Sequence, residues 1–280
     1  MRFGVNTLIW SATFDPALVP WDALVAAGVD GIEAPCFSPA DFDRAGFDKA
    51  LETHRLSATL VSVNPPGANP ISDDAGERAR ALEHWRAVIA LAGEVGAESL
   101  VGPTYSPVGH LPGRRRTQQE WARAVDFHQQ LGPALEDAGI ELAIEPLNRF
   151  ETYFLNTAAD SVALAQAIDH PRIGILLDTF HANIEEKSLE AAYRTCGPYL
   201  KHVHTCENDR GIPGSGHVSW SAVLRSIRET GYDGWLTIES FNANQPEIAA
   251  ATAIWRDLAP STDDIAVRGT QFLRGLWATL

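Results

Sequence analysis

The sequence predicts an α/β protein, a single (β/α)8 TIM barrel that occupies residues 1–280 as one domain. Eight short apolar runs, many of them rich in β-branched residues, alternate with amphipathic stretches, which is the pattern of repeated βα units and a parallel sheet. The length of 280 residues also suits a barrel, which typically needs about 250. The first run is not followed by a Gly-x-Gly-x-x-Gly segment, so the sequence does not favour a dinucleotide-binding fold.

The eight expected strands recur along the whole chain. They are expected near residues 3–7, 29–34, 57–63, 97–102, 140–145, 173–178, 200–205 and 235–239. Glycines that fit the ends of helices stand just before four of these strands, at Gly28, Gly96, Gly139 and Gly231.

The segments between the strands show helical patterns. Leu82, Trp85, Ile89 and Ala92 recur at helical spacing before the fourth strand. Thr117 and Glu120 have the spacing of a capping box and begin the helix before the fifth strand. The Gly132-Pro133 pair inside that helix is expected to kink or divide it.

The charge balance argues against nucleic acid as a partner. The chain has 22 Lys and Arg residues against 36 Asp and Glu residues, a formal net charge of −14, so it repels a phosphate backbone. The basic run at residues 114–116 is expected to be a solvated loop rather than an anion clamp.

Cysteine content and hydropathy indicate a cytoplasmic protein. Cys36, Cys196 and Cys206 are too few and too scattered for a disulfide framework, which points to a reducing compartment. A stretch of the ~20 apolar residues that span a bilayer is not found, nor is a long apolar region at the N-terminus, so a membrane is not an expected partner.

Four successive strands, the fifth to the eighth, end in residues that can bind a metal: Glu145, Asp178, His204 and Glu239. The gaps of 33, 26 and 35 residues between them each correspond to one βα unit, so the four side chains can converge at the rim where barrel enzymes carry their chemistry.

A divalent cation would allow three carboxylates to share that rim, because like charges in a low-dielectric site raise one another's pKa values. Oxygen ligands with one imidazole suit Mn²⁺ or Mg²⁺ and also admit Co²⁺. His202 and His204 face the same side of their strand. His204 is nearer the loop and is the expected ligand, whereas His202 is expected to be hydrogen-bonded in the barrel layer below.

Further polar residues follow these strand ends. Asn148 and Glu151 follow the fifth strand, His181 follows Asp178 closely, and Glu207 and Arg210 follow His204. We expect His181 and Arg210 to hold substrate hydroxyls or an enediolate oxygen, and Glu151 to support them through hydrogen bonds.

Six segments carry a family resemblance: residues 145–151 (EPLNRFE), 177–186 (LDTFHANIEE), 204–210 (HTCENDR), 231–234 (GYDG), 239–241 (ESF) and 255–257 (WRD). They resemble the ketose 3-epimerases, that is the D-tagatose, D-allulose and L-ribulose 3-epimerases of the xylose-isomerase-like barrel superfamily of sugar phosphate isomerases and epimerases. The similarity covers most of the chain and is most specific in its second half.

The resemblance implies an isomerase with a Mn²⁺-type centre, for which Co²⁺ or Mg²⁺ could substitute, held by the four strand-end residues. It implies that Glu145 and Glu239 also act as acid and base, and that Glu151, His181 and Arg210 contact the sugar. We further expect substrate contacts from the residues after the first strand, with Trp10 and Phe14 forming an apolar wall beside Asn6.

The expected reaction is epimerisation of a free ketose at C3 through a metal-bound cis-enediolate. The C3 proton becomes acidic when a cation chelating O2 and O3 polarises the C2 carbonyl. Inversion removes a proton from one face and returns one to the other, which requires two carboxylates. Glu145 and Glu239 fit because they close strands on either side of those bearing Asp178 and His204.

Other functions remain open at this point. An aldose–ketose isomerase or a dehydratase of the same superfamily could use the same centre with the substrate shifted by one carbon. A catalytically silent sugar-binding protein would need no paired carboxylates. An endonuclease of this barrel type would need more histidines and a basic face. Besides the sugar, the expected partner is a second copy of the chain, in a homodimer or homotetramer.

Overall fold

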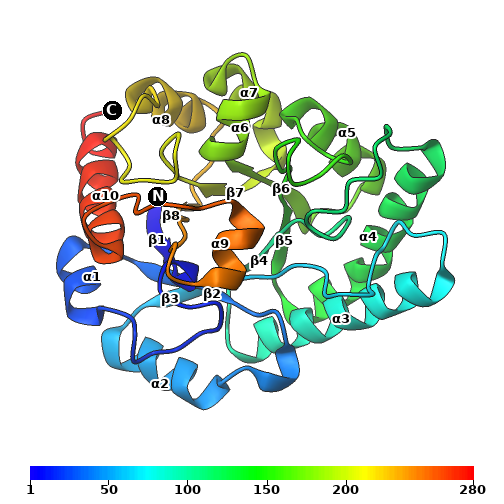
Figure 1. Ribbon diagram of the computed structural model, residues 1–280, viewed down its shortest axis with the longest axis horizontal. Coiled ribbons are helices and arrows are strands. Elements are labelled where there is room, and N and C mark those ends of the chain that lie inside the picture. Colours follow the sequence, from blue (N-terminus) through cyan, green and yellow to red (C-terminus); the bar gives the residue numbers. More distant parts are fainter.

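The computed structural model describes the backbone of residues 1–280 and every side chain except that of Glu247. Within this part, eight parallel strands close into a barrel in which each strand pairs with the next and β8 pairs with β1 (Figure 1). The predicted barrel is confirmed, and every expected strand lies within two residues of its expected bounds. The strands are β1 Arg2–Asn6, β2 Gly31–Pro35, β3 Ser57–Val61, β4 Ser99–Gly102, β5 Glu141–Ile144, β6 Ile173–Asp178, β7 Leu200–His204 and β8 Trp235–Ile238.

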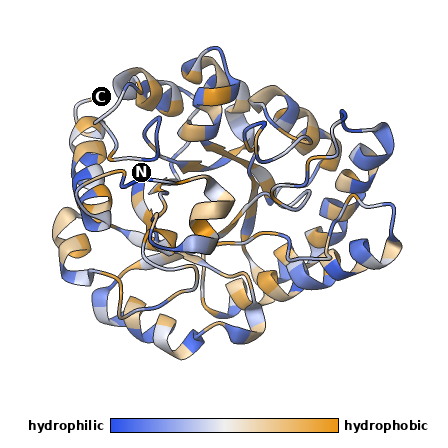
Figure 2. Cartoon of the chain, in the orientation of Figure 1, coloured by the Kyte–Doolittle hydropathy of each residue, from blue (hydrophilic) through white to orange (hydrophobic). Residues whose placement is uncertain are grey.

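Helices surround the barrel, except α9 (Pro246–Thr252), which lies over its middle in Figure 1 and contributes to the cavity described below. Figure 2 shows that the helices carry hydrophobic residues on some faces and hydrophilic residues on others. They are α1 Trp21–Ala27, α2 Arg44–His54, α3 Ala75–Glu94, α4 Gln118–Ala138, α5 Ala158–Ile168, α6 Thr179–Glu185, α7 Leu189–Cys196, α8 Trp220–Glu229, α9 Pro246–Thr252 and α10 Thr262–Trp277. The predicted helical face is confirmed in α3, where Trp85, Ile89 and Ala92 are completely buried. Among the described helices, none has the length and apolar composition that crossing a bilayer requires.

Helix ends follow the sequence signals, with one exception. The capping box of α4 is present, since Thr117 Oγ1 accepts the backbone N–H of Glu120 and the Glu120 carboxylate accepts that of Thr117. All four glycines expected at helix ends have positive φ, between +66° and +86°. The expected division of α4 is wrong, because the helix continues through Pro133. Pro133 and Gln129 are both exposed, so water can replace the donor that the Gln129 carbonyl loses.

The barrel interior is apolar on one side and polar on the other. Val61, Val101, Ala143 and Leu176, from β3 to β6, pack together as one buried cluster. The interior side chains of β1, β2 and β7 are instead polar, and all are fully buried: Asn6, Glu33, His202 and His204. Polar groups buried in this way require partners, and these partners lead to the site at the carboxyl ends of the strands.

Candidate metal centre

The four predicted metal ligands converge. Glu145 follows β5, Asp178 and His204 end β6 and β7, and Glu239 follows β8. Each offers one ligand atom, and these four atoms lie within 4.8 Å of one another. Their side chains are all buried, with at most 5% of any residue exposed. The alternation of side chains along parallel strands and the common rim of a barrel therefore place them as the sequence predicts.

The donor atoms of this group fit a divalent cation. Glu145 Oε1 and His204 Nδ1 are buried, and neither has a hydrogen-bond partner among the described residues. His204 Nδ1 lies 3.5 Å from Glu145 Oε1 and 3.4 Å from Glu239 Oε2. Buried polar atoms are normally paired. An unpartnered nitrogen and oxygen that face the same point, beside two further carboxylates, are what an Mn²⁺-like ion would satisfy.

The electrostatics of the group also favour a positive charge. Burial, together with the charges of Glu239 and Asp178, raises the pKa of Glu145 to about 8. Burial also raises the pKa of Asp178. For Glu239 burial acts in the same direction, but His204 and Arg210 outweigh it and the pKa is lowered. A cation bound between these groups would stabilise all three carboxylates in their ionised form.

Arg210 supplies a fixed positive charge beside the predicted ligands. Its Nη1 donates to Asp178 Oδ2 at 2.8 Å and to Glu239 Oε2 at 2.7 Å. The guanidinium lies over the rings of Phe180 and Phe241, 4.2 and 4.8 Å from their centroids. The backbone of Arg210 has φ of +68°, which non-glycine residues rarely adopt, and its carbonyl accepts Ser240 Oγ–H at 2.6 Å. Such backbone strain is typical of functional sites.

His181 lies between Asn148 and Arg210. The backbone N–H of Asn148 donates to His181 Nδ1 at 3.1 Å, and Arg210 Nη2 lies 3.1 Å from His181 Nε2. Nε2 lies 3.7 Å from Glu145 Oε1 and 3.8 Å from Asp178 Oδ2. Burial and the neighbouring charges of Arg210 and His204 lower the pKa of His181 well below its usual value, so the ring is neutral. Asn148 Nδ2 also donates to Glu151 Oε1 at 2.7 Å.

A cavity of about 190 Å³ opens beside these groups. It is smaller than the roughly 300–1,000 Å³ of pockets that take drug-sized ligands. Its polar wall consists of Glu145, Glu151, His181, Arg210 and Glu239. The remaining wall is mostly apolar and includes Leu8, Phe37, Val61, Leu147, Phe241 and, from α9, Ile248. The cavity therefore suits a small molecule with polar groups at one end.

Three residues expected to contact the substrate, Asn6 at the end of β1 and Trp10 and Phe14 after it, do not line the cavity. Asn6 is fully buried below the predicted ligands, where its Nδ2 donates to Glu33 Oε1 at 2.9 Å and to Glu239 Oε1 at 3.3 Å. Trp10 Nε1 donates to Asp263, and Phe14 packs against Phe47 with ring centroids 5.1 Å apart.

The expected apolar wall is thus formed by other residues. The 3-10 turn Thr7–Ile9 follows β1 immediately and is capped by the Asn6 side chain, which accepts the backbone N–H of Leu8. This turn places Leu8, rather than Trp10 or Phe14, on the cavity. Glu207 also has a local role, since it accepts hydrogen bonds from Val218 N and Trp220 Nε1 and so folds its own loop.

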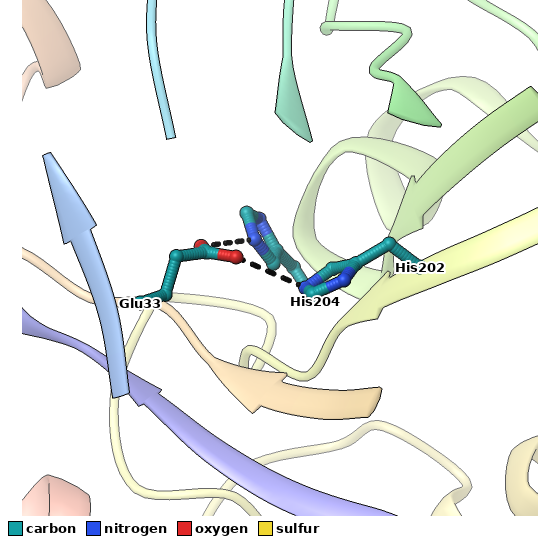
Figure 3. A group of neighbouring side chains, drawn as sticks. All are labelled: Glu33, His202 and His204. Atoms are coloured by element: carbon teal, nitrogen blue, oxygen red, sulfur yellow. Dashed lines mark hydrogen bonds and ion pairs between the residues drawn. The ribbon is translucent and has the colours of Figure 1, made fainter. Parts of the chain in front are cut away.

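Glu33, on β2, is a site residue that the sequence interpretation missed. It is fully buried, and its Oε1 lies 2.8 Å from His204 Nε2 while its Oε2 lies 3.1 Å from His202 Nε2 (Figure 3). Burial opposes its ionisation, but the two imidazoles outweigh burial and hold its pKa below the usual range. The available signal was a lone acid between Ile32 and Ala34 in an otherwise apolar strand, where an interior charge needs a partner.

Comparisons with known proteins point in one direction. A family model described as xylose isomerase-like TIM barrel matches residues 21–263. A probable ketose 3-epimerase of Synechocystis sp. is 34% identical, with 100% of this chain and 98% of the relative covered. A ketose 3-epimerase of Arthrobacter globiformis is 30% identical, with 98% and 96% covered. The crystal structure of D-allulose 3-epimerase from Methylomonas sp. in complex with D-allulose superimposes with a TM-score of 0.92 at 27% identity, covering 98% of this chain and 96% of that one.

Proposed function

Since the chain belongs to the xylose isomerase-like TIM barrel family and, within it, to the ketose 3-epimerases, we propose that it epimerises a free ketose with the help of a divalent cation. Glu145, Asp178, His204 and Glu239 would hold this cation, and Mn²⁺ is the first candidate. The chain is an isomerase, and epimerisation of a ketose at C3 is the activity of its family. The observation that carries the metal assignment is the pair of unpartnered buried atoms, Glu145 Oε1 and His204 Nδ1, which face each other among the predicted ligands at one end of the cavity.

The bound cation would supply Lewis acidity that polarises the C2 carbonyl and so acidifies the C3 proton. The residues of the chain supply the proton transfer. Glu145 and Glu239 leave the barrel from β5 and β8, on either side of β6 and β7, and both line the cavity. One carboxylate would remove the C3 proton from its face, and the other would deliver a proton to the opposite face.

The remaining polar wall would orient the sugar. The neutral His181 ring lines the cavity beside the Arg210 guanidinium, which is held by Asp178 and Glu239 and can donate to sugar oxygens. Glu151, with one oxygen on Asn148, can accept from a hydroxyl. These groups are held by bonds to their neighbours, and such pre-organisation lowers the cost of fixing the substrate.

The distribution of charge favours an unphosphorylated substrate. The Arg210 guanidinium is already paired with two carboxylates, and much of the cavity wall is apolar. In the basic run, Arg114 pairs with Glu120 and Arg116 pairs with Asp160. With a net charge of −14, the molecule also repels dianions.

A panel of free and phosphorylated ketoses assayed with added Mn²⁺ tests the proposal, with products identified by NMR. We expect the C3 epimer of a free ketose. A clearly higher kcat/KM for a ketose phosphate than for every free ketose would reject the unphosphorylated substrate. An aldose or a dehydrated product would indicate one of the related reactions, and tight sugar binding without turnover would indicate a binding protein.

A further inference from the structure

Below the predicted metal ligands lies a fully buried polar group that we call the Glu33 layer. It consists of Asn6, Glu33, Thr59, His202 and His204, with at most 1% of any of them exposed. Its members come from β1, β2, β3 and β7, so the layer joins strands that face each other across the barrel (Figure 3). Glu33 is the carboxylate at its centre.

The two nitrogens of His204 have different surroundings. Nε2 lies 2.8 Å from Glu33 Oε1, which is hydrogen-bond distance. Nδ1 has no hydrogen-bond partner among the described residues and faces Glu145 and Glu239 at 3.5 and 3.4 Å. A neutral imidazole has one N–H and one lone pair, and a metal takes the lone pair. With the proton on Nε2 and donated to Glu33, the lone pair on Nδ1 is directed at the proposed cation.

Glu33 is itself held in place by neighbours on both sides. Its Oε1 also accepts Asn6 Nδ2–H at 2.9 Å, and its Oε2 accepts Thr59 Oγ1–H at 2.9 Å. Because β1 and β3 flank β2 in the sheet, these two donors fix the carboxylate from either side. The acceptor that His204 meets is therefore rigid as well as charged.

We propose that Glu33 is a positioning residue of the metal centre, which fixes the tautomer and ring orientation of His204 so that Nδ1 binds the cation. The inference rests on the metal centre proposed above. A carboxylate that accepts the remote N–H of a metal-binding imidazole also makes that imidazole a stronger donor, and loss of such a partner typically weakens metal binding about 10–100-fold. Glu33 does not contact the sugar in this scheme and acts through His204.

A different role for the same atoms would be a second metal site, because Glu33, His202 and His204 also offer three ligand atoms within 4.8 Å. Both nitrogens of His202 are buried without a hydrogen-bond partner among the described residues, which a second cation could satisfy. The geometry at Glu33 itself favours hydrogen bonding. Both oxygens of Glu33 already accept hydrogen bonds from Asn6 and Thr59, and the contact to His204 has the length of a hydrogen bond. The number of ions bound per chain separates the two roles.

The test is Mn²⁺ binding by calorimetry to metal-stripped wild type and to the variants Glu33→Gln and Glu33→Ala. We expect one ion per wild-type chain and a Kd increased about 10–100-fold in both variants. Thr270→Val is the matched control, because it removes a buried threonine hydrogen bond, to the carbonyl of Ala266 in α10, and has no contact with Glu33 or His204. Its Kd should stay close to that of wild type. Circular dichroism and thermal unfolding without metal show whether each variant is folded. If Glu33→Ala does not fold, the test rests on Glu33→Gln, which keeps the side-chain volume.

A second readout requires no substitution at Glu33. In ¹⁵N-histidine NMR of wild type with saturating Mg²⁺, His204 should show a protonated Nε2 and a ligated Nδ1. The inference is overturned by ligation through Nε2, by an unchanged Kd in a folded Glu33 variant, by an equal loss in Thr270→Val, or by two ions per chain. If wild type binds no cation, the proposed centre itself fails, whereas failure of the Glu33 variants alone leaves that centre intact.

Discussion

The carboxylates of Glu145 and Glu239 approach each other to within 4.8 Å from β5 and β8, the strands on either side of β6 and β7. Two acid/base groups that reach one small cavity from different strands can address different faces of one carbon. Isomerisation between C1 and C2 transfers a proton within one face and needs only one such group. The predictions below concern this pair, the proposed cation and the stability of the barrel.

Turnover in D₂O should place one deuterium at C3 of the product and none at C1. The returning proton comes from a carboxyl group that exchanges with solvent, and only C3 is deprotonated in the proposed reaction. NMR or mass spectrometry of the isolated product locates the label. Deuterium at C1 would instead identify an aldose–ketose isomerase.

Glu145→Gln and Glu239→Gln should each lower kcat by about 10²–10⁴-fold, or more where proton transfer limits the rate. The amide keeps an oxygen that can contact the cation but cannot transfer the proton. The two variants should differ in partial reactions. Each should still exchange the C3 proton of the one epimer whose face retains its carboxylate, which is measured by loss of label from C3-deuterated sugars.

Metal content must be measured in both variants, because a lost ion would also lower the rate. Near wild-type epimerisation with metal bound would show that the two glutamates are ligands only and that the two-base mechanism is wrong.

Removal of metal by EDTA should abolish epimerisation, and Mn²⁺ or Co²⁺ should restore it, because the clustered carboxylates need a cation to be ionised together. Thermal stability should fall in parallel. An ion that binds only the folded state at 100 times its Kd adds about 2.7 kcal/mol to the free energy of unfolding. Differential scanning calorimetry with and without Mn²⁺, at matched ionic strength, measures the change. Full activity in a verified metal-free preparation would contradict the proposed centre.

Loss of Glu120 should destabilise the barrel without affecting the cavity. Hydrogen bonds from Arg114, from the backbone of Thr117 and from Tyr153 lower the pKa of Glu120 to about 2, from 4.5. Because the pKa is depressed in the folded state, the ionised Glu120 carboxylate stabilises that state. This stabilisation is fully present above pH 4.5 and is lost as the pH falls toward 2. Glu120→Gln should therefore lower the free energy of unfolding by about 1–2 kcal/mol at pH 7.

Urea unfolding between pH 7 and pH 3 measures this effect. The difference in the free energy of unfolding between Glu120→Gln and wild type should shrink as the pH falls. The control is Glu52→Gln, at an exposed position of α2, which should unfold like wild type throughout. A destabilisation by Glu120→Gln that is constant with pH would mean that the carboxylate charge is not its cause.

The sequence was sufficient to predict the barrel and the convergence of the four ligands. Both predictions need only the local strand pattern, the spacing between strands and the fact that barrel strands end at a common rim. It did not predict that Glu33 lies against His204, since 171 residues separate them and their contact crosses the barrel interior. Nor did it place Leu8 on the cavity in preference to Trp10, because that depends on the short 3-10 turn after β1. Both errors concern contacts that a strand pattern does not encode.

The pairing of the first strand with the last has a consequence for protein synthesis. Figure 1 shows β1 beside β8, and the hydrogen bond from Asn6 to Glu239 joins residues 233 positions apart. At a translation rate of about 5–20 residues per second, the ribosome needs roughly 10–50 s to produce the partner of β1. Throughout that time one edge of β1 has no strand to pair with, and unpaired edges promote aggregation. The sheet can therefore close, and Glu239 can join the other three predicted ligands, only after the last barrel strand has left the exit tunnel.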